Sequence, residues 1–274
     1  MLNLHKTKCT LFCHFYNEEW LLPHWIRHHV NLFDDCIMIN YASTDSSVDI
    51  IRELAPHWKI VDSGNKQFDA ELCDTEIMKM EEDVQGWKMV LNVTEFLIVD
   101  DLKTVLRKIE NTKLDMVRFK GYQINDTKEE MRSGFDNTKS IVLQRYHGQA
   151  DPWRDRIIHK QRNGSYYIGR HYNTPGLKIN SYSKIQHKNI PIYEGLYLFW
   201  YRFAPFKEQL PRKIQISSRI PQSDIDKGFG WNHWELNEKK LYERWQQEEA
   251  KNTNLLEIPE VGKAYENIRH SLVW

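Results

Sequence analysis

The first hundred residues alternate between short apolar runs and segments in which apolar residues recur every three or four positions. The runs at 8–15, 36–40 and 59–62 are typical of buried β-strands. Strands that alternate with helices in this way predict an α/β core built on a mainly parallel sheet. The predicted helices follow the polar turns at 16–19 and 42–45 and occupy about 70–85.

An apolar, β-favouring run at residues 87–101 is expected to form a strand in the middle of the sheet. Polar residues interrupt this run at Asn92, Thr94 and Glu95, near the point at which a central strand would end. In an open α/β sheet, ligands bind outside the carboxyl ends of the strands. These three side chains are therefore candidates for a binding site.

The rest of the chain has a less regular pattern. A helix is predicted over 102–109, a strand over 115–121 and a polar surface loop over 125–140. A chain of 274 residues with this pattern predicts a single domain, 1–274, with an elaborated C-terminal part. The later predicted elements are short strands at 141–143 and 156–159, an apolar run at 196–205, a glycine-containing loop at 228–233 and a last amphipathic helix at about 237–250.

Composition narrows the class of protein. Lys and Arg total 38, as do Asp and Glu, and a net charge of zero argues against a nucleic-acid-binding protein, which needs a basic excess. The four cysteines form no C-x-x-C pair and lie in predicted strands or helices, so buried free thiols and a reducing compartment are expected. No apolar run reaches the ~18 residues that a membrane span needs, and no signal peptide is recognised. The expected location is the cytoplasm.

Three motifs, in this order, resemble the family-two-like glycosyltransferases of the GT-A fold. The resemblance covers roughly 8–122 and implies that this part is the nucleotide-binding half. It implies that 123–274 forms the acceptor half and the C-terminal helices. The matching residues are Asn17-Glu18, Leu22-Pro23, Trp25-Ile26 and His29, then Ser43 and Asp45, and then Trp87, Glu95, Phe96 and Leu97.

The resemblance implies a transferase that moves a sugar from a nucleotide-sugar donor, with a UDP-sugar favoured, to a hydroxyl of a glycan or another acceptor. It further implies a single displacement with inversion. In this interpretation Tyr16 stacks near the uracil, and the amide oxygen of Asn40 accepts from the base N–H. Glu18 binds ribose hydroxyls and Asp45 contacts the ligand. The alternatives are a strand-end cap for Asn40, a helix cap for Glu18 and an N-cap for Asp45.

The family holds a divalent metal, Mn²⁺ or Mg²⁺, with two aspartates, and Asn92 and Thr94 stand at these positions here. Neutral oxygens bind such hard cations poorly, and the remaining carboxylate, Glu95, points to the opposite face of a strand from its neighbour. Two alternatives follow: a metal bound through Glu95, or direct neutralisation of the diphosphate by basic side chains. The basic candidates are Arg212, Lys213, Arg219 and His233.

The transfer also needs a base that removes the proton of the acceptor hydroxyl. Asp151 and Asp155 follow the predicted sheet at a suitable distance, and His171 is a comparable candidate. The loop at 228–233 is expected either to fold over the donor, with His233 on the diphosphate, or to anchor the last helix through its aromatic residues. A competing interpretation is a non-catalytic nucleotide- or glycan-binding relative whose metal motif has decayed.

Overall fold

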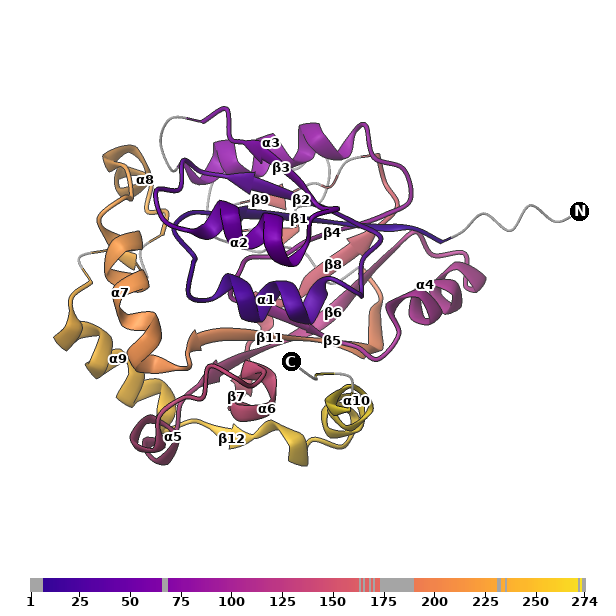
Figure 1. Ribbon diagram of the computed structural model, residues 1–274. Helices are drawn as coiled ribbons and strands as arrows, with labels where there is room; N and C mark the ends of the chain where they lie inside the picture. Colours follow the sequence, from indigo (N-terminus) through magenta and orange to yellow (C-terminus); the bar gives the residue numbers. More distant parts are fainter. Residues whose placement is uncertain are drawn as a thin grey trace, which may run out of the picture.

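A mixed β-sheet runs through the centre of the molecule, with helices on both of its faces (Figure 1). The structure is a computed structural model that describes residues 7–65, 69–162, 164, 166–167, 169, 171–172, 190–230, 233–234, 236–270 and 272. Its strands are β1 (Cys9–Phe15), β2 (Asp35–Asn40), β3 (Lys59–Asp62), β4 (Trp87–Val90), β5 (Glu95–Ile98), β6 (Met116–Asn125), β7 (His147–Ala150), β8 (Arg156–His159), β9 (Tyr166–Tyr167), β10 (His171–Tyr172), β11 (Ile192–Phe203) and β12 (Thr253–Asn254). Its helices are α1 (Leu22–His29), α2 (Ser47–Leu54), α3 (Ala70–Glu81), α4 (Leu102–Asn111), α5 (Lys128–Ser133), α6 (Ile141–Gln144), α7 (Phe206–Ser217), α8 (Gln222–Asp226), α9 (Glu238–Glu249) and α10 (Pro259–Arg269), with 3₁₀ turns η1 (Pro152–Arg154) and η4 (Leu255–Glu257).

The strand order of the main sheet is β12-β7-β6-β8-β4-β1-β2-β3, and β11 pairs with both β5 and β6. β1 is parallel to β2 and β4, and β2 is parallel to β3. β8 is antiparallel to both β4 and β6, so these two strands run in the same direction, and β11 is parallel to β6. The carboxyl ends of β1, β2, β3, β4, β6 and β11 therefore meet at one side of the sheet, which we call the carboxyl edge. The predicted α/β fold, a mixed, mostly parallel sheet flanked by helices, is confirmed.

The two faces of the sheet contribute to different hydrophobic clusters. Leu11 and Cys13 pack with Trp25 of α1, whereas Phe12 packs with Ile77 of α3. Successive side chains of a strand point to opposite faces, so α1 and α3 cover opposite sides of β1. All four cysteines are buried free thiols, as the sequence predicts. Among the residues that the structure describes, no helix has the length and apolar character needed to cross a membrane.

The run at 87–101 is not one strand, which corrects the prediction from sequence. β4 ends at Val90, the chain turns, and β5 then pairs antiparallel with β11. The turn is closed at Glu95, whose backbone N–H donates to the carbonyl of Asn92 (2.9 Å) and whose carboxylate accepts from the backbone N–H of Asn92 (2.9 Å). The polar positions of this run therefore form a turn between two strands.

Three other segments also differ from the prediction. The segment 141–143, expected as a strand, begins α6. A run of three apolar residues is too short to distinguish the period of a helix from that of a strand. The polar segment 125–140 contains α5, which starts with a capping box between Thr127 and Glu130. α9 is not the last helix, since α10 follows it and packs Val261 into the core.

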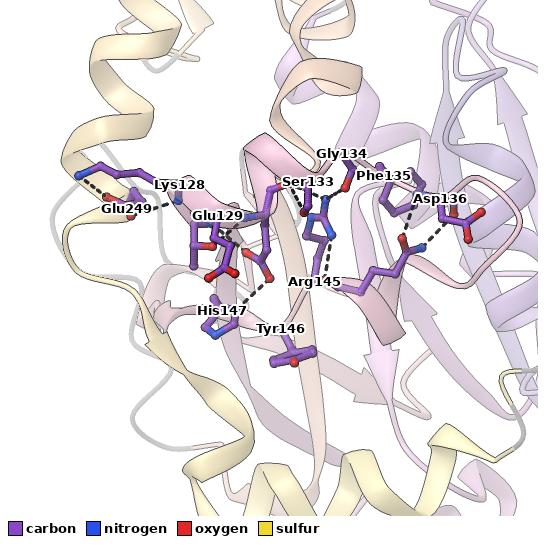
Figure 2. A pocket seen from close by; sticks show the side chains of 13 residues that line it. Lys128, Glu129, Ser133, Gly134, Phe135, Asp136, Arg145, Tyr146, His147 and Glu249 are labelled. Carbon is purple, nitrogen blue, oxygen red and sulfur yellow. Dashed lines mark hydrogen bonds and ion pairs between the residues drawn. The ribbon is translucent and has the colours of Figure 1, made fainter.

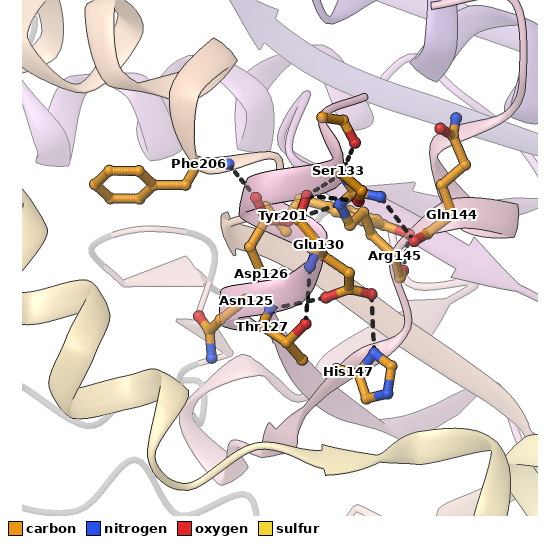
Figure 3. Close-up of polar contacts among 12 residues, drawn as sticks. Asn125, Asp126, Thr127, Glu130, Ser133, Gln144, Arg145, His147, Tyr201 and Phe206 are labelled. Carbon is orange, nitrogen blue, oxygen red and sulfur yellow. Dashed lines mark hydrogen bonds and ion pairs between the residues drawn. The ribbon is translucent and has the colours of Figure 1, made fainter. Parts of the chain in front are cut away.

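A buried ion pair holds the start of α7 against the end of β6 (Figure 3). Asp126 accepts from Arg145 Nε (2.7 Å) through one oxygen and from the backbone N–H of Phe206 (2.8 Å) through the other. Arg145 also donates to the carbonyl of Gly134 (2.5 Å), which fixes the end of α5. The side chains of Asp126 and Arg145 are 2% and 5% exposed. These contacts of Asp126 and Arg145 therefore position α7. Figure 1 shows α7 together with α5, α8 and α9 at the left of the view, whereas α4 lies at the right.

We predict that Asp126→Ala lowers the free energy of unfolding by about 3–5 kcal/mol, because it leaves the buried guanidinium of Arg145 without a counter-charge. Asp49→Ala, at a carboxylate that is 82% exposed, serves as the control and should leave the unfolding midpoint nearly unchanged. Urea unfolding followed by circular dichroism measures both variants. Equal midpoints for the two variants would show that the buried pair does not stabilise the fold.

Candidate functional site

The loops that follow β1 and β2 are hydrogen-bonded to each other at the carboxyl edge. Asn17, with a φ of 47°, donates its backbone N–H to the Ser43 hydroxyl (3.1 Å) and accepts from the N–H of Thr44 through Oδ1 (2.7 Å). Asn40 Oδ1 accepts from the N–H of Ser43 (2.9 Å), and its Nδ2 donates to Asp62 Oδ1 (2.9 Å). The amide of Asn40, predicted to bind a base, thus makes the contacts of a strand-end cap.

Asp45 also joins these two loops. Its carboxylate accepts from the backbone N–H groups of Glu19 (3.0 Å) and Ser47 (3.0 Å). Ser46, and not Asp45, occupies the N-cap position of α2. Side chains of this kind replace backbone partners in turns, so Asp45 contributes to the shape of the loops at the carboxyl edge.

The segment around α7 lies over the first loop. Arg219 places its guanidinium carbon 3.2 Å from the centre of the Tyr16 ring and 5.4 Å from the centre of the Tyr41 ring. Arg212 of α7 donates from Nε to both carboxylate oxygens of Glu18 (2.8 and 2.7 Å). Three residues predicted to bind the donor therefore lie close together: Arg219 contacts Tyr16, and Glu18 contacts Arg212 of α7.

Glu95, the predicted metal ligand, is completely buried and forms an ion pair with Arg156. Its two oxygens also accept from the backbone N–H (2.9 Å) and the side-chain Nδ2 (3.2 Å) of Asn92. A divalent cation needs several open anionic oxygens, whereas both oxygens of Glu95 are engaged and Asn92 and Thr94 are neutral. These residues do not fit a divalent metal, and the described part of the chain contains no group of three His, Cys, Asp or Glu side chains able to hold one.

A group of cations converges beside β11 at the same edge. Arg154 and Arg202 both lie over the ring of Trp200, with their guanidinium carbons 3.6 and 5.4 Å from its centre. The ammonium of Lys213 lies 4.8 Å from the centre of the Phe203 ring. The set that we call the basic cluster consists of Arg154, Arg202, Arg212, Lys213 and His233.

The members of the basic cluster differ in their partners. Arg202 pairs with Glu248 (3.5 Å) and Arg212 with Glu18 (2.6 Å). Lys213 is only 7% exposed, and within the described residues its ammonium has no carboxylate at ion-pair distance. Lys213 therefore differs from Arg202 and Arg212, whose charges are each balanced by a carboxylate.

This environment disfavours the charged forms of the cluster. Burial, followed by repulsion from neighbouring arginines, holds the pKa of Lys213 well below its ordinary value. Burial and the nearby Lys213 do the same to the pKa of His233. Burial and the charge of Arg156 lower the pKa of Arg154 to about 10. A bound anion would raise each of these lowered pKa values, because a nearby negative charge favours the charged form of a basic group.

The predicted catalytic carboxylates lie just before β8. Asp155 is 6% exposed and accepts from Arg118 (2.8 Å) and from the backbone N–H of Gly121 (3.2 Å), and burial raises its pKa. Asp151 caps η1 and lies 3.7 Å from Arg154 Nε, at the border of the basic cluster. His171 lies in β10, but its side chain is outside the described part of the structure.

The glycine-containing loop brings His233 to the basic cluster. Gly228 and Gly230 have φ values of 78° and 66°, which other residues rarely adopt. The backbone N–H of His233 donates to the carbonyl of Gly230 (2.7 Å), and Trp234 Nε1 donates to the carbonyl of Phe229 (2.9 Å). The residues 231–232 lie outside the described residues, so the predicted closure of this loop stays a prediction.

Arg154 and Arg202 are two members of the cluster that sequence reasoning missed. A signal existed for Arg154, which lies between the candidate carboxylates Asp151 and Asp155. Arg202 had no comparable signal, because it lies within an apolar run that is typical of a buried strand. Only the pairing of β11 with β6 brings it close to Gln123, to whose amide oxygen it donates (2.7 Å).

A separate cavity of about 830 Å³ lies beside α5 (Figure 2). Two ion pairs form in the cavity wall: Glu130 with His147 (2.9 Å) and Lys128 with Glu249 (3.7 Å). The lining residues are Thr127, Lys128, Glu129, Glu130, Ser133, Gly134, Phe135, Asp136, Gln144, Arg145, Tyr146, His147 and Glu249.

We predict that Glu95→Gln lowers the free energy of unfolding by about 3–5 kcal/mol, because Arg156 loses its buried counter-charge. The variant should leave the affinity for Mn²⁺ unchanged, since neither oxygen of Glu95 is open to a metal. Urea unfolding and calorimetric titration with MnCl₂ measure the two effects. A loss of Mn²⁺ binding without a loss of stability would make Glu95 a metal ligand.

No protein-family model and no curated protein sequence matches this chain. Among solved structures, the chain is similar to S. aureus TarS 1-349 in complex with UDP, with 11% identity and a TM-score of 0.37 over 56% of this chain and 46% of that chain. It is similar to glucosyl-3-phosphoglycerate synthase from Mycobacterium tuberculosis in complex with Mn²⁺, UDP-glucose and phosphoglyceric acid, with 11% identity and a TM-score of 0.34 over 56% and 57% of the two chains. It is similar to GalNAc-T7 with UDP, GalNAc and Mn²⁺, with 9% identity and a TM-score of 0.45 over 73% and 44%. The matched part spans about half the length of these proteins. With TM-scores below 0.5, the function has to be inferred from the residues of the site.

Proposed function

We propose that this protein is a glycosyltransferase that moves a sugar from a nucleotide-sugar donor to a hydroxyl of a glycan or another acceptor, with a UDP-sugar as the favoured donor. One observation carries the proposal: the aromatic ring of Tyr16 and a buried basic cluster lie along the same carboxyl edge. A nucleoside diphosphate needs both, since its base stacks and hydrogen-bonds while its phosphates bind cations. The ordered motifs from Asn17 to Leu97 support the same function.

The nucleoside is assigned to the loops after β1 and β2. Tyr16 supplies a ring for the base, Glu18 supplies a carboxylate for ribose hydroxyls, and Asp45 shapes the loop. Arg219 now lies against one face of Tyr16, so a base that stacks on this face has to displace it. The ion pair of Glu18 with Arg212 has to open, or to be shared, when ribose binds.

The reaction is assigned to the region between the basic cluster and the carboxylates before β8. The acceptor oxygen attacks the anomeric carbon while the bond from that carbon to the diphosphate breaks and the nucleoside diphosphate leaves with the electron pair. Asp155 or Asp151 takes the proton of the acceptor hydroxyl, and the raised pKa of Asp155 increases its basicity. The basic cluster stabilises the negative charge that develops on the leaving diphosphate. Attack opposite the leaving group inverts the anomeric centre.

A second candidate function is non-catalytic binding of a nucleotide or glycan. The contacts of Asp155 favour it, because a carboxylate held by Arg118 and by the N–H of Gly121 has its oxygens engaged. The two functions differ in turnover and not in nucleotide binding. They are therefore separable by experiment.

We expect UDP to bind, and a screen of UDP-, GDP- and CMP-sugars, each with EDTA and with Mn²⁺, to show release of UDP. Calorimetry measures the binding, and a coupled assay measures nucleotide release. Asp151→Asn or Asp155→Asn, whichever removes the base, should lower turnover about 10²–10⁴-fold without a change in UDP affinity. Asp49→Asn, on the exposed side of α2, is the control with unchanged turnover.

Absence of nucleotide binding under every condition would remove the proposal. Tight UDP binding without release from any donor, in the presence of varied acceptors, would favour the non-catalytic alternative. Circular dichroism of the two Asn variants separates a loss of the base from a loss of folding.

A further inference from the structure

Lys213 is a buried cation in a cationic environment. It is 7% exposed, and its ammonium lies 4.8 Å from the centre of the Phe203 ring, while the guanidinium carbon of Arg202 lies 5.0 Å from the centre of the same ring. The charges of Arg212, Arg202, Arg154 and Arg244 help to lower its pKa. Burial of an unpaired ammonium is costly, and nearby like charges add to the cost. The chain has no net charge, so this accumulation is local and is not a consequence of composition. An anion bound among these side chains would offset the cost of burying them together.

The geometry of the basic cluster suits an anion with several oxygens. Its members come from four separate segments: η1, β11, α7 and the turn that carries His233. The ring of Trp200 lies beneath both Arg154 and Arg202 and limits where these two side chains can go. Guanidinium groups bind phosphate oxygens through pairs of N–H donors, and an ammonium adds a compact charge. Two linked phosphates offer enough oxygens for such a set.

The cluster is adjacent to the turn at which the family motif would place its metal. In the β5–β11 ladder Trp200 pairs with Glu95, and the backbone N–H of Tyr201 donates to the carbonyl of Thr94 (2.8 Å). Glu95 is occupied by Arg156, so the turn offers no open carboxylate. The positive charge next to this turn therefore comes from the side chains of the basic cluster and not from a metal held by the turn.

We propose that the basic cluster binds the diphosphate of the donor directly, with Lys213 at its centre, and performs the charge neutralisation that a divalent metal would otherwise perform. The identity of the diphosphate as part of a nucleotide sugar rests on the proposed function. The anion site itself does not rest on it, because it follows from the burial and convergence of the cations. Binding in this site does not require a metal.

The test is calorimetric titration of the full chain with inorganic pyrophosphate, and separately with UDP-glucose, once in buffer that contains EDTA and once in buffer that contains Mn²⁺. The parent protein is expected to bind pyrophosphate, and Lys213→Met to bind it about 10- to 100-fold more weakly. Lys263→Met removes an equal charge from the exposed side of α10 and should bind pyrophosphate like the parent.

Unfolding of the ligand-free variants provides a second measurement. Lys213→Met should raise the urea midpoint, because it removes a buried, repelled charge and keeps an apolar side chain of similar length. A residue with only a structural role would not combine higher stability with weaker pyrophosphate binding. A lower midpoint for Lys213→Met would contradict the inference.

The outcomes separate the two proposals. Pyrophosphate binding in EDTA that depends on Lys213, without binding of any nucleotide sugar, supports the anion site and contradicts the proposed function. The inference is overturned if pyrophosphate and UDP-glucose bind only with Mn²⁺ and bind equally well to Lys213→Met and to the parent. This result would leave the proposed function standing.

Discussion

The buried ion pair between Glu95 and Arg156 is the constraint on which the rest of the site depends. It joins β5 to β8, and the contacts of Glu95 with Asn92 close the turn between β4 and β5. Both partners are almost completely excluded from water, so removal of one leaves a buried charge. The carboxylate that the sequence offers to a metal is therefore a structural group, and the chemistry of the edge has to come from elsewhere.

The C-terminal part of the chain supplies most of the basic cluster. α7 is positioned at one end by the contact of Asp126 with the N–H of Phe206 and along its length by the pair of Arg212 with Glu18. These contacts bring Lys213 to the arginines on Trp200. α7 thus contacts the loop after β1 through Arg212 and also contributes two members of the basic cluster, Arg212 and Lys213.

The motif residues that resemble glycosyltransferases have a definite structural role in this fold. Trp25 donates its indole N–H to the carbonyl of Glu95 (2.9 Å), and His29 Nε2 accepts from the N–H of Leu97 (3.2 Å). Burial lowers the pKa of His29, which keeps the ring neutral and able to accept. The motif therefore fastens α1 to β5, and its spacing over one helical turn follows from the need to place both rings on the face that meets the strand.

Hydrophobic periodicity in the sequence determined the α/β class, the strands at 8–15, 36–40, 59–62 and 156–159 and the burial of the four cysteines, because the period and the apolar character of a segment are local properties of its sequence. Polar groups at the ends of the predicted strands indicated the carboxyl edge as the place of the candidate site. Tertiary structure alone decided that 87–101 turns back on itself, that 141–143 is helical, and that Glu95 belongs to Arg156. It also decided that Lys213 meets Arg154 and Arg202. Pairing and repulsion between charges depend on the distances between segments that are far apart in the sequence. The pattern of residues along the chain carries no information about these distances.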